Sequence, residues 1–245
     1  MYADLRDTID PDPARARANF HVAVKLSLAF VAVLWLIQVL LGAPGIDVGD
    51  YGVRPRVVAG LLGILSAPLV HGDYSHLAGN SVPVAVLLCA MLYLYPRSSR
   101  IVLPAVYVVP GVAVWLFARG SSHIGASGLV YGMFAYVLVA GLLRRDRRAI
   151  ATSLLVCFLY GTLVWGVLPI EPHMSWETHL AAAMIGVILA LAQCQRDVPL
   201  RRTYSWEAEQ SIADDQPASD ETSTDHARPL PLPEQPGVDD VERYR

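Results

Sequence analysis

The sequence predicts an all-α membrane protein that crosses the bilayer six times. Hydrophobic residues make up 54% of the 245 residues, and the mean hydropathy of +0.41 exceeds that of ordinary soluble domains. The apolar residues gather into stretches that approach the roughly 20 residues a helix needs to cross a bilayer. We expect membrane helices over residues 20–41, 76–95, 101–118, 127–143, 150–168 and 179–194.

The distribution of basic residues predicts the orientation. Short cytoplasmic loops of membrane proteins are enriched in arginine and lysine. The loops on one side of the predicted helices contain only three basic residues, Arg54, Arg56 and Arg119. We therefore expect both termini in the cytoplasm, on the side that holds Arg15, Arg17, Arg97, Arg100, Arg144, Arg145, Arg147, Arg148, Arg196, Arg201 and Arg202.

Composition divides the chain into three regions. Residues 1–19 form a polar cytoplasmic segment, and residues 20–194 form the six-helix membrane domain. Residues 195–245 are rich in Asp, Glu, Ser, Thr and Pro, a composition that cannot bury enough apolar surface to fold. We therefore expect a disordered cytoplasmic tail.

The first outer loop, residues 42–75, is long and contains an apolar stretch at 57–70. Gly60, Gly63 and Pro68 interrupt this stretch. It is too short and too broken to span a bilayer, so we expect it to lie in the interface or to re-enter the membrane.

Three polar residues lie at one depth on helices that run from the outside inward. Asn80, Ser127 and His179 each precede an arginine at the inner end of their helix by 17 residues. At about 1.5 Å per residue this places them roughly 25 Å above the inner boundary, just below the outer surface of a core about 30 Å thick. Polar residues at such depth are functional candidates, and a serine beside a histidine forms a nucleophile with its base.

Small residues predict that the helices carrying Ser127 and His179 pack closely. Gly128 and Gly132 form a small-xxx-small pair, which lets helix backbones approach. His179 shares one helix face with Ala182, Ala183, Gly186 and Ala190. Close backbone contact would bring the Ser127 hydroxyl within reach of the imidazole.

At these positions the chain resembles the rhomboid family of intramembrane serine proteases. Residues 125–128 read Gly-Ala-Ser-Gly, similar to the family's GxSG motif, in which the serine is the nucleophile. His179 followed by Gly186 is similar to the His-x6-Gly pattern of its sixth helix. Tyr131 matches the tyrosine that packs against the catalytic histidine.

The second helix extends the resemblance. His76-x-x-x-Asn80 is similar to the family's HxxxN motif, whose side chains line the oxyanion hole, and His71 matches a histidine found just upstream. The resemblance implies a serine endopeptidase that cleaves transmembrane segments with a dyad of Ser127 and His179. It implies a supporting role for Tyr131, Gly125, Gly128 and Gly186.

Two features depart from the family pattern. The Trp-Arg pair typical of the first loop is missing, and the chain reads Arg56-Val57-Val58-Ala59 there. The glycine three residues after the histidine is Ala182, which predicts slightly looser packing between the two helices.

Other functions remain open at this stage. Five histidines near the outer side would allow a metal site, although no HExxH motif is present; they are His71, His76, His123, His173 and His179. A non-catalytic membrane chaperone or a transporter is a further alternative.

We expect no cofactor, no metal and no binding of nucleic acid. The expected partners are transmembrane protein substrates and the lipid bilayer. We expect the plasma membrane of a bacterium as the location; the sequence leaves the oligomeric state open.

Overall fold

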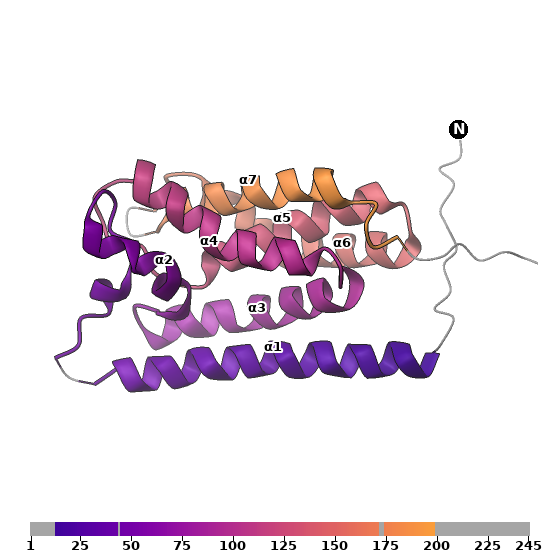
Figure 1. Ribbon diagram of the computed structural model, residues 1–245, viewed down its shortest axis with the longest axis horizontal. Helices are drawn as coiled ribbons and strands as arrows, with labels where there is room; N and C mark the ends of the chain where they lie inside the picture. The colour runs from indigo at the N-terminus through magenta and orange to yellow at the C-terminus, as the bar shows by residue number, and fades with distance from the viewer. Residues whose placement is uncertain (1–12, 44, 172–173, 199–245) are drawn as a thin grey trace, which may run out of the picture. The chain divides into compact units, whose positions relative to one another are not determined.

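A computed structural model describes residues 13–43, 45–171 and 174–198 (Figure 1). His173 and most of the predicted tail lie outside the described residues. Six helices in the described part of the chain are long and apolar enough to cross a membrane, which confirms the predicted spans. They are α1 (Pro13–Leu41), α3 (Tyr74–Leu94), α4 (Ser99–Phe117), α5 (Ser127–Arg144), α6 (Arg147–Tyr160) with its continuation η4 (Gly161–Val167), and α7 (Trp176–Gln193).

Two of these helices differ in detail from the sequence prediction. Helix α1 begins at Pro13, seven residues before the predicted apolar stretch. The alanines and arginines that follow Pro13 are good helix formers. The fifth span changes from an α-helix to the 3-10 helix η4 at Gly161. The apolar pattern marks a span but does not distinguish these two helix types.

Helix α5 is the centre of the membrane domain. It packs against α3, α4, α6 and α7. In its most apolar 18-residue segment 67% of the residues are buried, against 28% or less in the corresponding segments of the other five helices. A side chain at Gly186 on α7 would come within 2.3 Å of the Gly132 carbonyl oxygen. Glycine at this position therefore allows the close approach of α5 and α7, and the nearby Ala182 is fully buried at the same interface.

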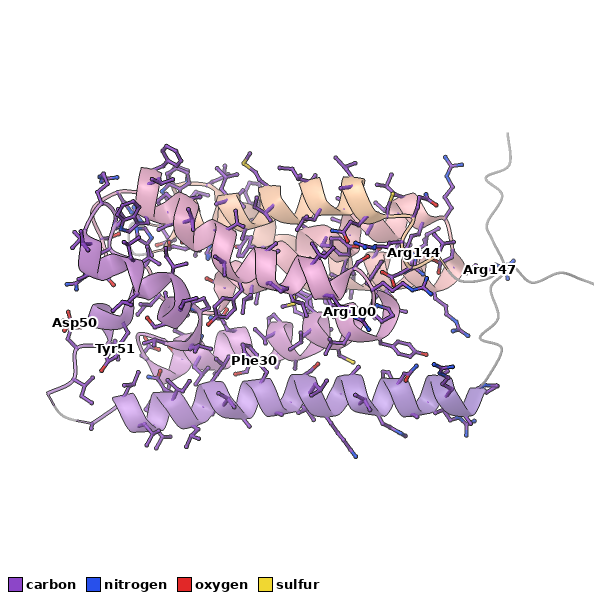
Figure 2. All side chains as sticks on the ribbon, in the orientation of Figure 1. Phe30, Asp50, Tyr51, Arg100, Arg144 and Arg147 are labelled. Atoms are coloured by element: carbon purple, nitrogen blue, oxygen red, sulfur yellow. The ribbon has the colours of Figure 1, made fainter. Side chains whose placement is uncertain are left out.

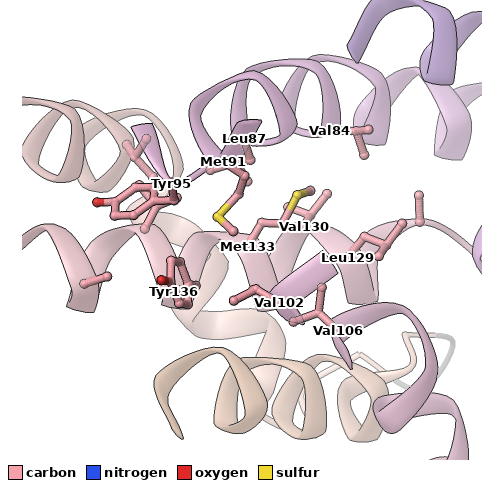
Figure 3. Close-up of a cluster of buried hydrophobic side chains, with 14 of the residues drawn as sticks. Val84, Leu87, Met91, Tyr95, Val102, Val106, Leu129, Val130, Met133 and Tyr136 are labelled. Carbon is pink, nitrogen blue, oxygen red and sulfur yellow. The ribbon is translucent and has the colours of Figure 1, made fainter. Parts of the chain in front are cut away.

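The main hydrophobic core lies between α3, α4 and α5 (Figure 3). Each helix contributes residues spaced three or four apart, so that one face of each meets the others. The core includes Val84, Leu87 and Met91 from α3, Val102 and Val106 from α4, and Leu129, Val130, Met133 and Tyr136 from α5.

The loop of residues 42–75 folds into short helices, each too short to cross a membrane: η1 (Val48–Tyr51), η2 (Val58–Leu61), α2 (Gly63–Ser66) and η3 (Ala67–Leu69). Helices η2 and α2 pack on α4, and η3 packs on α5. The guanidinium of Arg56 donates to the carbonyl of Ala118, 2.9 Å away, at the end of α4. The indole of Trp115 on α4 donates to the carbonyl of Val57 at 2.9 Å. These bonds attach the loop to α4 without the Trp-Arg pair of the family pattern.

Several of the arginines that the sequence assigns to one side lie at one end of the helices. Arg100, Arg144 and Arg147 lie at one end in Figure 2, whereas Asp50 and Tyr51 lie at the other. The side of the membrane on which each end lies stays a prediction.

One arginine of this set is buried. The Arg144 side chain forms an ion pair with Asp146 (2.8 Å), donates to the Leu94 carbonyl (2.7 Å) and lies over the Tyr95 ring. Its charge is neutralised inside the protein, so Arg144 contributes less to orientation than the exposed arginines beside it.

The segment after α7 is bonded to the start of α4. The Asp197 carboxylate accepts hydrogen bonds from the backbone N–H groups of Arg97 and Ser98, each at 2.9 Å, and from the Ser98 hydroxyl at 2.6 Å. These bonds connect the residues that follow α7 to the turn before α4.

Candidate active site

The N-terminal ends of α3, α5 and α7 meet around one cavity. Its volume is about 510 Å³. The three helices lie side by side in Figure 1. The five polar and aromatic candidates from the sequence all line this cavity: His76, Asn80, Ser127, Tyr131 and His179.

Ser127 and His179 are within hydrogen-bonding distance, although 52 residues separate them in the chain. The Ser127 Oγ atom lies 2.8 Å from His179 Nε2. The other ring nitrogen, Nδ1, lies 2.9 Å from the carbonyl oxygen of Gly166 in η4. A carbonyl can only accept, so Nδ1 carries the proton and Nε2 presents its lone pair to the serine hydroxyl. This is the protonation state that a general base requires.

Tyr131 lies against the imidazole of His179. Its ring and that of His179 are stacked, with centroids 4.0 Å apart. Tyr131 is one helical turn after Ser127 on α5, so the same helix supplies both the hydroxyl and the surface that supports the imidazole.

His76 and Asn80 lie beside the dyad, on the α3 wall of the cavity. The Asn80 side-chain amide donates to the His76 carbonyl at 3.2 Å, which uses one of its two N–H groups. The His76 backbone N–H donates to the Asp73 carboxylate, which caps α3. The cap fixes the first turn of α3 and with it the direction of the His76 side chain.

Gly125 has two reasons to be glycine. Its φ of +112° lies in a region that other residues rarely adopt. A Cβ atom there would also lie 2.7 Å from Cε1 of His76. Either feature alone would disfavour a side chain, and together they let the chain before Ser127 pass directly against the imidazole of His76.

Gly128 lies at the contact between α5 and α7. A Cβ atom there would lie 3.0 Å from the Thr178 methyl group, beside His179. The two helices approach closely at the height of the dyad as well as deeper, at Gly186.

His71 has a position that sequence reasoning did not predict. It is completely buried, and its Nε2 atom accepts the backbone N–H of Ala126 at 3.2 Å. Burial, together with the nearby His76, lowers the pKa of His71 to about 4. A neutral His71 therefore holds the residue that precedes Ser127.

His123 joins the loop before α5 to the start of α7. Its Nδ1 atom lies 2.5 Å from the hydroxyl of Ser175, which in turn contacts the hydroxyl of Thr178. Burial lowers the pKa of His123. Beside this chain of contacts, Arg119 forms an ion pair with Glu177 at 3.3 Å. No motif marks these contacts, because they join segments about 50 residues apart.

The histidines do not form a metal site within the described residues. Residues 13–43, 45–171 and 174–198 contain no group of three His, Cys, Asp or Glu side chains that could hold a metal ion. Of the five histidines considered for that alternative, His76 and His179 line the cavity, and the ring of His71 lies 5.1 Å from that of His76.

Comparison with known proteins identifies the family. The model of the rhomboid domain matches residues 59–196. An uncharacterized protein of Mycobacterium tuberculosis (strain H37Rv) and one of Mycobacterium bovis are each 36% identical over 185 residues, covering 71% of this chain and 76% of theirs. An uncharacterized protein of Mycobacterium leprae is 34% identical over 185 residues, 71% of this chain and 72% of its own. With this match over more than half its length, and with six membrane-length helices, the chain is an integral membrane protein that belongs to the rhomboid family.

Proposed function

We propose that the protein is an intramembrane serine endopeptidase that cleaves transmembrane segments of other membrane proteins. The observation that carries the proposal is the 2.8 Å contact between Ser127 Oγ and His179 Nε2 at the wall of a cavity large enough to hold part of a polypeptide. Membership of the rhomboid family, whose members are generally intramembrane serine proteases, supports it.

In the first half of the reaction, Ser127 Oγ attacks the carbonyl carbon of the substrate while its proton passes to His179 Nε2. The resulting tetrahedral oxyanion lies near the start of α5, where the first backbone N–H groups have no partner within the helix. The Ser127 N–H and the side chains of His76 and Asn80 donate to that oxyanion. The intermediate collapses as the C–N bond breaks, and His179 gives its proton to the leaving amine.

In the second half, a water molecule enters from the outer side. His179 takes a proton from this water as its oxygen attacks the acyl carbon. The ester bond to Ser127 breaks, and the proton on His179 returns to the serine oxygen. The products are a carboxylic acid and a free enzyme. The reaction uses only groups of the protein and water.

The resemblance also suggests the substrate class and the setting. Substrates would carry a small residue before the cleaved bond in a locally unstable helix. The orientation inferred from arginines places both termini in the cytoplasm and the cavity near the outer face of a bacterial plasma membrane.

Cleavage of a panel of model transmembrane substrates tests the proposal. Purified wild type should cleave at least one substrate, and Ser127→Ala should cleave none. Ser27→Ala is the matched control, because Ser27 bonds only within α1, to the Ala23 carbonyl. A serine-directed phosphonate should label the wild type and Ser27→Ala but not Ser127→Ala. A metal chelator should leave cleavage by the wild type unchanged. Cleavage by Ser127→Ala at the wild-type rate would contradict the mechanism.

A further inference from the structure

We propose that the backbone carbonyl of Gly166 is a third member of the catalytic arrangement and positions His179 for proton transfer. The inference rests on the proposed function, and it assigns a role to η4, the outer end of the fifth membrane span. The starting observation is the 2.9 Å contact between His179 Nδ1 and the Gly166 oxygen.

This contact decides which nitrogen of His179 carries the proton. The hydrogen bond that one ring nitrogen makes sets the state of the other. Because the Gly166 oxygen can only accept, the proton sits on Nδ1 and Nε2 stays free to accept the proton of Ser127. When Nε2 takes that proton the ring becomes positive, and the carbonyl dipole stabilises the charge. In Ser-His-Asp enzymes a carboxylate performs these tasks.

The sequence of η4 explains why this carbonyl is available. In a 3-10 helix the Gly166 carbonyl would accept from the N–H of residue 169. That residue is Pro169, which has no N–H. In an α-helix the donor would be Ile170, but its N–H bonds to the Leu168 carbonyl at 2.8 Å. Both local donors are thus removed, and the carbonyl is left for the imidazole.

The glycine itself is required by close contact. A Cβ atom on Gly166 would lie 1.9 Å from the Tyr131 hydroxyl oxygen and 3.4 Å from His179 Nδ1. Gly166 is buried, which limits the access of bulk water to its carbonyl. A side chain here must move either η4 or Tyr131, and each movement disturbs the position of the imidazole. The other glycine of η4 differs: a Cβ atom on Gly161 meets only the Cys157 sulfur, at 3.9 Å.

The experiment compares three variants with a matched control. Gly166→Ala displaces the carbonyl, and Pro169→Ala restores an N–H that can compete for it. Replacement of Val167 by its α-hydroxy acid turns the Gly166 carbonyl into a weaker ester acceptor without adding a side chain. Gly161→Ala is the control within the same 3-10 helix. Thermal unfolding in detergent establishes that each protein is folded.

Two measurements decide the outcome. Nitrogen NMR of protein labelled in its histidine rings, with the His179 signals assigned by their loss in His179→Asn, should show a proton on Nδ1 in the wild type and in Gly161→Ala. The ester and Pro169→Ala proteins should show increased protonation at Nε2. For substrate cleavage, kcat should fall about tenfold or more in Gly166→Ala and the ester protein, with KM little changed, since one buried hydrogen bond is lost.

The inference and the proposed function fail in different ways. Cleavage of no substrate by the wild type would refute the proposed function, whereas the NMR result would still report the state of His179. A wild-type ring protonated at Nε2 would overturn the inference even if the enzyme is active. Wild-type kcat in the folded ester protein would overturn it as well. If Gly166→Ala does not fold, the ester and Pro169→Ala proteins carry the test.

Discussion

Tyr131 and His179 are stacked face to face, with their ring planes only 6° apart. The stack covers one face of the imidazole, and the Tyr131 hydroxyl points to the glycine whose carbonyl holds Nδ1. The ring of Tyr131 therefore restricts rotation of His179, and its hydroxyl occupies the space that a side chain at Gly166 would need.

Removal of the ring should reduce turnover more than removal of the hydroxyl. Tyr131→Phe keeps the stack, so we expect kcat within about threefold of wild type. Tyr131→Leu loses an aromatic contact of roughly 0.5–1.5 kcal/mol, which corresponds to a roughly two- to tenfold lower kcat. Steady-state cleavage of a model substrate measures both. A larger loss in the phenylalanine variant than in the leucine variant would show that the hydroxyl, and not the ring, is the important group.

The dyad should behave as one unit. Ser127→Ala and His179→Ala should each lower cleavage by on the order of 10⁴ or more, and the double variant should be no worse than either single variant. The measurement is single-turnover cleavage by proteins shown to be folded in detergent. Additive losses would mean that the two residues act in separate steps, despite the 2.8 Å between them.

The two proposed oxyanion donors should affect kcat rather than KM. Loss of one such donor typically costs a factor of about 10² to 10³, and because water can enter this cavity we expect about 10² for Asn80→Ala and for His76→Ala. Asn80→Asp is a useful comparison, since it keeps the size and removes the N–H donors. A rise in KM alone for Asn80→Ala would assign Asn80 to substrate binding instead.

The orientation can be tested by cysteine labelling in intact cells, in a variant that lacks Cys89, Cys157 and Cys194. Ser122 lies in the loop before α5, and Arg148 is the second residue of α6; both are exposed. An impermeant reagent should label Ser122→Cys and not Arg148→Cys. Asp146 is unsuitable as a probe because it is buried in the ion pair with Arg144. The reverse labelling pattern would place the cavity near the cytoplasmic face.

The membrane helices could be predicted from the sequence because each is a local apolar pattern. The approach of Ser127 to His179 could be predicted as well, because small residues such as Gly128 and Gly186 mark the faces on which two helices meet. The resemblance to a family then supplied the expected role of each residue. Each of these predictions rests on a local pattern, either an apolar stretch or small residues along one helix face, even though the Ser127–His179 contact itself joins two distant helices.

Other parts of the site could not be predicted, because they depend on contacts between distant segments. Arg56 reads as a loop charge, yet it donates to carbonyls at the end of α4. Gly166 belongs to no motif, and its role depends on Pro169 and on a histidine 13 residues away. The burial of Arg144 depends on the chain turning back at Asp146. None of these follows from hydrophobic periodicity.

The contact between His71 and Ala126 predicts that acid destabilises the protein. The pKa of His71 falls from its ordinary 6.5 to about 4 in the folded protein, mainly through burial, with a smaller effect of the nearby His76. Below about pH 6.5 the unfolded chain takes up a proton that the folded protein does not. The contribution of His71 to the free energy of unfolding is therefore fully present above this pH. It is lost as the pH falls toward 4, by up to about 3 kcal/mol.

Thermal unfolding in detergent between pH 4 and 8 measures this effect. His71→Gln cannot titrate, but its side-chain carbonyl can still accept the Ala126 N–H, so its unfolding temperature should depend less on pH than that of the wild type. Some dependence should remain, because burial also lowers the pKa of His123 and acts in the same direction. Asp73 has a lowered pKa too, but a carboxylate of this kind loses its stabilising effect only below about pH 4, at the edge of the measured pH range.

An identical pH dependence in wild type and His71→Gln would show that His71 is not the group that senses acid. The Gly125–Ser127 backbone would then be held by other contacts, of which the bond from the Gly125 N–H to the Ala67 carbonyl is the nearest.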